Sequence, residues 1–208
     1  MLKKYGFVKK STNCIEKAIK LTLEDFRNGD VSDEPAITNR MLGAIKLAMN
    51  DCKVKGIHWR AKTLKSLVRN SEEHEFGADF AGILKIDLPD FKETKGFLAQ
   101  AKIVKPQMSK EELLRLHKQC YQMLEVTQQS FVFLYSSYNV RIVSANCVIS
   151  TQNNPMGCYS QSSNSFFEGY LKSSIGDRRI VSSKREDLEE ILKQNKAREL
   201  LYLEATSE

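Results

Sequence analysis

Three polar side chains at the ends of two apolar segments suit metal-assisted chemistry. Asp79 opens the segment "ADFAGILKIDL" (78–88), and Gln100 and Lys102 lie two residues apart in "KGFLAQAKIV" (95–104). Side chains at alternate positions of a strand share one face, so Gln100 and Lys102 would project together. If the two segments pair as a hairpin, Asp79 joins them. Such groups are costly to bring together away from water unless they pair or bind an ion.

An oxygen-rich group of this kind matches the preference of a hard divalent cation. Mg²⁺ is held by one or two carboxylates together with water and substrate phosphates. Asp79 would supply a carboxylate oxygen, Gln100 its side-chain carbonyl and Ala101 its backbone carbonyl. Lys102 would orient or help deprotonate a water molecule, or stabilise charge on a phosphate. We therefore expect a Mg²⁺ site, which Mn²⁺ would also occupy, that generates a nucleophile.

Each of these residues also has a simpler structural interpretation. Asp79 could bond its own backbone in a turn, and Lys102 could protect an edge strand against pairing with another chain. Glu34 lies in the first turn of an expected helix and could simply complement the helix dipole. The occurrence of all of them in one order along the chain favours a shared site.

Hydrophobic periodicity predicts the elements that would position these residues. Apolar residues spaced by three and four predict helices over 11–27, 32–51, 109–129, 165–177 and 185–205. Ser32 or Asp33 would cap the second of these helices, and Ser109 with Glu112 matches a capping box at the third. Runs rich in β-branched and aromatic residues predict strands over 57–67 (with a helix as the competing interpretation), 78–88, 95–104, 130–137 and 139–149. Polar loops are expected over 69–75 and 150–164. This order predicts an α/β protein with a mixed central β-sheet flanked by α-helices.

The same residues resemble the PD-(D/E)xK, or restriction-endonuclease-like, nuclease superfamily. Its pattern is an Asp followed across a hairpin by (D/E)xK, and Asp79 with the QxK motif Gln100-Ala101-Lys102 is similar to a known variant. A Glu in the first core helix also belongs to the pattern, and Glu34 is the matching acid. The resemblance covers about residues 33–149.

The resemblance implies a restriction-endonuclease-like core at residues 31–180. A helix at 1–30 would precede this core, and a C-terminal helix at 181–208 would pack on it. The implied catalytic residues are Glu34, Asp79, Gln100 and Lys102, and the implied metal ligands are Glu34, Asp79, Gln100 and Ala101. The resemblance also suggests that Gln119 approaches the site, and the alternative is a solvated position or one at the edge of the core.

This chain departs from the superfamily pattern in one respect. Gln100 replaces the usual carboxylate, which removes a negative charge from the site. Glu73 and Glu75 precede Asp79 and could compensate, or they could belong to a solvated loop.

The composition fits a globular protein that acts on a polyanion. The chain has 208 residues, of which 41% are hydrophobic, so a core can form without disulfides. Its 32 Lys and Arg exceed its 26 Asp and Glu, and a net charge of +6 suits a nucleic-acid partner. Five cysteines without CxxC spacing argue against a disulfide framework and a zinc site. No apolar run has the length of a membrane span or a signal peptide, so we expect a cytoplasmic protein with no membrane partner.

Several residues outside the motif are candidates for nucleic-acid contact. Basic residues near both ends could bind phosphates or simply form solvated faces: Lys3, Lys4, Lys9, Lys10, Arg178, Arg179, Lys184 and Arg185. Trp59 and Tyr121 could stack on bases or belong to the core.

These observations together predict a metal-dependent nuclease that hydrolyses phosphodiester bonds. We expect an endonuclease acting on DNA rather than RNA, in restriction or anti-phage (antiviral) defence, as a homodimer or with a partner protein. The alternative is a catalytically weak or inactive nuclease-like protein that binds nucleic acid or regulates a partner.

Overall fold

A mixed β-sheet lies at the centre of the computed structural model, which describes residues 2–66, 77–151, 154–180, 188–194 and 197–207. Within these residues the sheet has seven strands: β1 (Ile57–Lys65), β2 (Ala78–Leu88), β3 (Phe91–Ile103), β4 (Ser130–Tyr135), β5 (Val140–Ser144), β6 (Gln161–Ser162) and β7 (Ala197–Ser207). The helices are α1 (Leu2–Asn28), α2 (Glu34–Asn50), α3 (Lys110–Val126), α4 (Ala145–Ser150), α5 (Ser163–Leu171) and α6 (Leu188–Gln194), with short 3₁₀ turns η1 (Pro155–Gly157) and η2 (Arg178–Ile180).

The strand order is β1-β7-β2-β3-β4-β5-β6. Strands β2 and β3 pair antiparallel, as expected for a hairpin. Strand β4 pairs parallel with β3, and the connection between them contains α3, because parallel neighbours need a long crossover. Strand β7 lies between β1 and β2 and runs parallel to β2.

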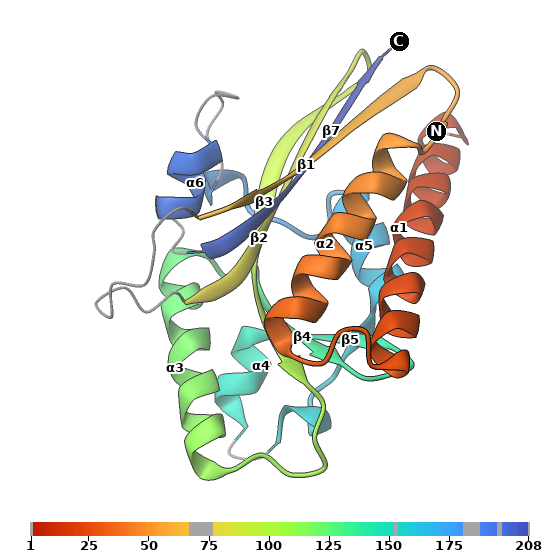
Figure 1. Ribbon diagram of the computed structural model, residues 1–208. Coiled ribbons are helices and arrows are strands. Elements are labelled where there is room, and N and C mark those ends of the chain that lie inside the picture. Colours follow the sequence, from red (N-terminus) through yellow and green to blue (C-terminus); the bar gives the residue numbers. More distant parts are fainter. Residues whose placement is uncertain (1, 67–76, 152–153, 181–187, 195–196, 208) are drawn as a thin grey trace.

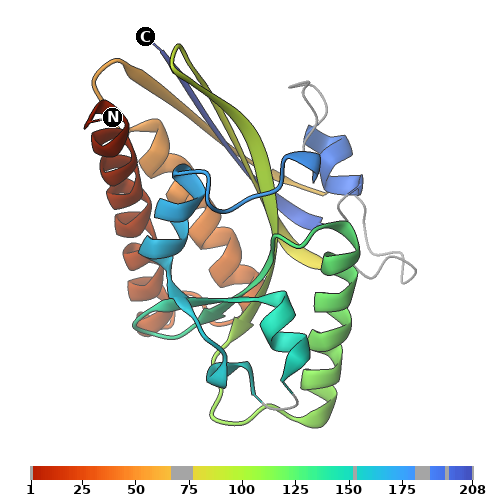
Figure 2. The ribbon, with the colours of Figure 1, turned by 180° about the vertical axis from the view of Figure 1, so that it is seen from behind.

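Helices cover both faces of the sheet (Figures 1 and 2). Helices α1, α2 and α5 lie on one face, and α3, α4 and α6 lie on the other. In β3 the side chains of Phe97 and Ala99 belong to the core of the first face, whereas Leu98 belongs to the core of the second. Because side chains alternate along a strand, Gln100 and Lys102 lie on the same face as Leu98, beneath α3.

Two helix starts that position the candidate site agree with their sequence signals. At α2 the side chain of Asp33 accepts a hydrogen bond from the N–H of Ala36 at 2.7 Å, which makes Glu34 the first helical residue. At α3, Ser109 and Glu112 form the expected capping box. The predicted capping box is confirmed, and of the two candidate caps of α2, Ser32 and Asp33, the cap is Asp33.

The predicted C-terminal helix over 185–205 is wrong for most of its length. Helix α6 ends at Gln194, and residues 197–207 form β7. Strand β7 has strands on both sides and helices over both faces, and its interior residues are buried. Burial of this kind overrides the helix propensity of its Leu, Glu and Ala residues. The C-terminal segment is therefore part of the sheet.

Two other strand predictions differ in outcome. Segment 57–67 is a strand over Ile57–Lys65, so the competing helix is wrong. Segment 139–149 is a strand only to Ser144, whose side chain accepts a hydrogen bond from the N–H of Cys147 and caps α4. The predicted strand is therefore wrong after that cap. The predicted loop at 69–75 lies outside the described residues.

The five cysteines are free thiols. Burial raises the pKa of the Cys52 thiol to about 12.

Among the described helices, none combines the length and the apolar character needed to cross a membrane.

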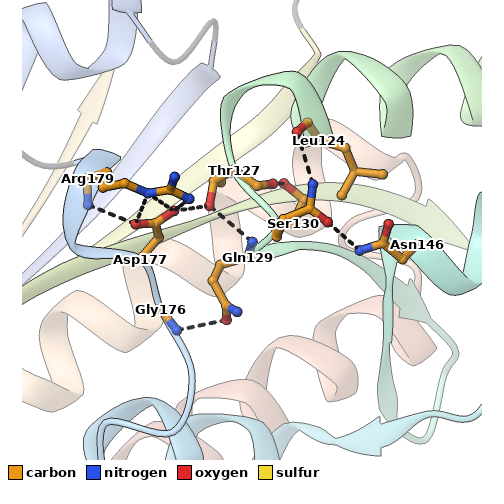
Figure 3. A network of polar contacts seen from close by, with 9 residues as sticks. Leu124, Thr127, Gln129, Ser130, Asn146, Gly176, Asp177 and Arg179 are labelled. Carbon is orange, nitrogen blue, oxygen red and sulfur yellow. Dashed lines mark hydrogen bonds and ion pairs between the residues drawn. The ribbon is translucent and has the colours of Figure 1, made fainter.

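A polar network around Asp177 ties the segment after α5 to the start of β4 (Figure 3). The carboxylate of Asp177 accepts a hydrogen bond from the hydroxyl of Thr127 at 2.7 Å and from the guanidinium of Arg179 at 2.8 Å. The backbone of Asp177 also exchanges two hydrogen bonds with Gly96 of β3. The network fixes the junction that follows α3, and α3 covers the candidate site.

We expect Asp177→Asn to lower the free energy of unfolding by about 1 to 2 kcal/mol at pH 7, because a charged hydrogen-bond acceptor is lost. The hydrogen bond from Arg179 holds the pKa of Asp177 well below its usual range. This contribution to stability is therefore complete above the unfolded-state pKa of about 4 and is lost as the pH falls. Urea unfolding between about pH 7 and pH 3 should show a steeper loss of stability for the wild type than for Asp177→Asn.

The exposed Asp90, in the β2–β3 turn, provides the matched control. Asp90→Asn should leave the stability and its pH dependence close to those of the wild type. Parallel stability curves for the wild type and Asp177→Asn would contradict the assignment.

Candidate active site

The four predicted catalytic residues line one cavity of about 340 Å³ on the α3 face of the sheet. They come from α2, β2 and β3, which are separate in the sequence. The complete lining is Glu34, Pro35, Asp79, Gln100, Lys102, Arg115, Lys118, Gln119, Gln122 and Arg198. The structure thus brings together the residues that the sequence motif selected.

Asp79 is held at the point where the β2–β3 ladder ends. The last paired residues are Phe80 and Ala99, so the next N–H of β3 on that side, from Ala101, needs another acceptor. The carboxylate of Asp79 accepts this N–H at 2.9 Å and also accepts a hydrogen bond from the Gln100 amide. Burial raises the pKa of Asp79, while the hydrogen bond from Ala101 opposes that shift.

Glu34 makes the equivalent contacts two residues further along β3. One of its oxygens accepts the N–H of Ile103 at 3.1 Å, and the other accepts the ammonium of Lys102 at 2.9 Å. The side chain of Lys102 is only 8% exposed, so this ion pair is largely removed from water. The role of Glu34 therefore extends beyond complementing the dipole of α2.

The simpler interpretations of Asp79 and Lys102 do not hold. Strand β3 lies between β2 and β4, so Lys102 does not protect a sheet edge. Asp79 accepts hydrogen bonds from β3, in contrast to an acid that closes a local turn.

Gln100 supplies the observation that bears on metal binding. Its side chain is 2% exposed and its amide nitrogen donates to Asp79, but its buried Oε1 has no hydrogen-bond partner among the described residues. Leaving such an oxygen unsatisfied costs about 1 to 3 kcal/mol. A cation at this position would satisfy it, and the carboxylates of Asp79 and Glu34 supply the hard oxygen ligands that Mg²⁺ prefers.

The donor set therefore fits a divalent cation through two carboxylates and an amide. Across the residues that the structure describes, no group of three or more His, Cys, Asp or Glu side chains could hold a metal ion. The N–H of Ala101 donates a hydrogen bond to Asp79. Metal binding by the backbone carbonyl of Ala101 stays a prediction. Glu73 and Glu75, the possible compensating acids, lie outside the described residues.

Helix α3 contributes a polar face that the motif analysis largely missed. Arg115, Lys118, Gln119 and Gln122 line the cavity, at helical spacings of three and four. Gln119 was expected near the site, and its buried Oε1 also lacks a hydrogen-bond partner within the described part of the chain. The spacing of the other three was visible in the sequence and could have indicated a common face.

Arg198 is the residue that the incorrect helix prediction concealed. The parallel register pairs Ala78 with Ala197 and Phe80 with Glu199, so Arg198 lies level with Asp79 on the neighbouring strand. Gln100 and Arg198 thus flank Asp79 from opposite sides. Only the placement of β7 in the sheet reveals this neighbour.

The basic residues predicted as phosphate contacts lie elsewhere. Arg178 pairs with Glu93, and Arg179 pairs with Asp177. Lys9 and Lys10 are exposed on α1, which covers the opposite face of the sheet. The side chains of Lys3, Lys4, Lys184 and Arg185 lie outside what the structure describes.

The two candidate stacking residues differ in exposure. Trp59 is 2% exposed, and its indole N–H donates to Ser11, so it belongs to the core. Tyr121 on α3 is 55% exposed and remains available for stacking.

Comparison with known proteins finds no matching family model, no matching characterised protein and no matching solved structure.

Proposed function

We propose that the protein is a metal-dependent nuclease that hydrolyses phosphodiester bonds, with DNA as the favoured substrate. The observation that carries the proposal is the buried oxygen of Gln100, which has no partner among the described residues. It lies beside a carboxylate in a cavity that is also lined by cations. A hard divalent cation together with a phosphate would satisfy both features.

Glu34, Asp79 and Gln100 would hold the metal, with the Ala101 carbonyl as a further ligand. Bound Mg²⁺ or Mn²⁺ lowers the pKa of a coordinated water and withdraws charge from a phosphate oxygen. The chain contributes ligands whose positions are already set by backbone hydrogen bonds to Ala101 and Ile103. Such preorganisation reduces the rearrangement needed during the reaction.

Lys102 would stabilise negative charge on the phosphate during the reaction. It shares a face of β3 with Gln100, and Glu34 orients its ammonium at 2.9 Å. A protonated lysine cannot bind the metal, so its contribution is electrostatic, or it assists the attacking water.

A restriction-endonuclease-like core is part of the same proposal. Asp79 and the QxK motif lie on the two strands of a hairpin, and Glu34 enters from the preceding helix. These three features are the ones that carry the resemblance to the PD-(D/E)xK superfamily. A setting in restriction or anti-phage defence, and a homodimeric or partner-bound assembly, stay predictions from that resemblance.

We expect the wild-type protein to cleave supercoiled plasmid DNA with Mg²⁺ or Mn²⁺ and to be inactive in EDTA. Asp79→Asn and Lys102→Met should each reduce the rate about 100-fold or more, because they remove a metal ligand and a charge-stabilising group. Asn at position 79 keeps an acceptor for the N–H of Ala101, so thermal unfolding should show a folded protein. The control is Lys92→Met, which changes an exposed lysine of the same strand as Lys102 and should cleave like the wild type.

The outcomes separate the alternatives. Intact plasmid with the wild type under both metals would overturn the nuclease proposal. DNA binding without cleavage would then favour the nuclease-like binding protein. Equal cleavage by the wild type, Asp79→Asn and Lys102→Met would show that these residues are not the source of activity.

We expect Gln100→Glu to lower the Mg²⁺ concentration for half-maximal cleavage by roughly tenfold, because a carboxylate replaces a neutral ligand. Without metal the new carboxylate would lie beside Asp79, so the melting temperature in EDTA should fall and Mn²⁺ should restore it. Activity against Mg²⁺ concentration and thermal unfolding with and without Mn²⁺ measure the two effects. An unchanged Mg²⁺ requirement together with a metal-insensitive melting temperature would argue against Gln100 as a ligand.

A further inference from the structure

The candidate cavity carries more positive than negative charge. Two carboxylates line it, from Glu34 and Asp79, together with four cationic side chains: Lys102, Arg115, Lys118 and Arg198. Lys102 pairs with Glu34. A divalent cation held by the two carboxylates would add to this positive excess, so the filled site favours an anionic ligand of several charges.

The other three cations approach the cavity from two different elements. Arg115 and Lys118 are one turn apart on the same face of α3, about 4.5 Å along the helix axis. Arg198 comes from β7, level with Asp79 and on the side away from Gln100. All three residues are exposed, so their charged ends can reach a ligand without burial of an isolated charge.

We propose that Arg115, Lys118 and Arg198 form a phosphate clamp, which binds the phosphates that flank the scissile one along a polynucleotide strand. The inference rests on the proposed nuclease function and adds the residues that hold the substrate. Guanidinium groups bind phosphate through two hydrogen bonds, whereas lysine acts as a point charge. Tyr121, exposed on the same helix, provides a surface for an unstacked base.

A polynucleotide accounts for these positions better than a small phosphate does. The cations come from two elements, α3 and β7, and their three positive charges exceed the charge of about −2 on one terminal phosphate. Successive phosphates of a strand provide separate charges. The buried oxygen of Gln100, without a partner among the described residues, independently marks this cavity as the place of a ligand.

The clamp is tested by DNA binding in EDTA, where metal-dependent cleavage does not occur. Fluorescence anisotropy would follow a fluorescein-labelled DNA of about 20 nucleotides, single-stranded and as a duplex, over a range of KCl concentrations. The logarithm of the affinity falls linearly with the logarithm of the salt concentration, and the slope here means the size of that fall. Removing one phosphate-binding cation should reduce the slope by about 0.7 to 0.9. We therefore expect the double variant Arg115→Gln/Lys118→Gln to lower the slope by about 1.4 to 1.8 and to bind at least roughly tenfold more weakly at low salt.

The matched control is the double variant Arg27→Gln/Lys110→Gln. It removes the same two charges, one from the exposed end of α1 and one from the first turn of α3, and neither residue lines the cavity. Its slope should remain within about 0.4 of the wild-type value. Arg198→Gln should lower the slope by about 0.7 to 0.9, and Arg198→Lys should recover most of that decrease, because the charge returns.

The outcomes distinguish this inference from the function on which it rests. If the wild type binds neither DNA, the proposed action on nucleic acid fails. If the wild type binds and the cavity variants match the control double variant, the clamp is overturned while the nuclease proposal stands. Displacement of labelled DNA by an equal concentration of thymidine monophosphate would also overturn the clamp, because it would indicate a site for a single nucleotide.

Discussion

The end of the β2–β3 ladder is the constraint on which the candidate site depends. Beyond Phe80 and Ala99 the strands no longer pair, and a buried N–H without an acceptor is costly. Asp79 and Glu34 accept the N–H groups of Ala101 and Ile103. The folded backbone therefore uses as acceptors the same two carboxylates that the proposed chemistry uses, and these hydrogen bonds fix their positions.

Strand β7 is the second determinant of the cavity. It separates β1 from β2 and places Arg198 next to Asp79. The cavity lining consequently combines α2, the β2–β3 hairpin, α3 and the last strand along the chain. Asp79 lies between the guanidinium of Arg198 on one neighbouring strand and the amide of Gln100 on the other, so its surroundings are asymmetric.

The parts of the fold that were predictable from sequence are those with local signals. The capping box of Ser109 and Glu112 and the cap of α2 depend on residues within one turn. The box was predicted correctly, and the sequence narrowed the cap to Ser32 or Asp33. The alternating pattern of the hairpin was sufficient to expect Asp79 and Gln100 close together. Strand β7 was not predictable in this way, because its Leu, Glu and Ala residues favour a helix and only its distant neighbours impose a strand.

The central position of β7 also has a consequence for the order of folding. Its partners β1 and β2 lie far back in the sequence, and closing such a long loop costs chain entropy before the new contacts repay it. The hairpin and α3 can form from local contacts, whereas Arg198 reaches Asp79 only when β7 is inserted. We therefore expect the cavity to be completed late in folding, because chains that have not yet inserted β7 lack the side that Arg198 provides.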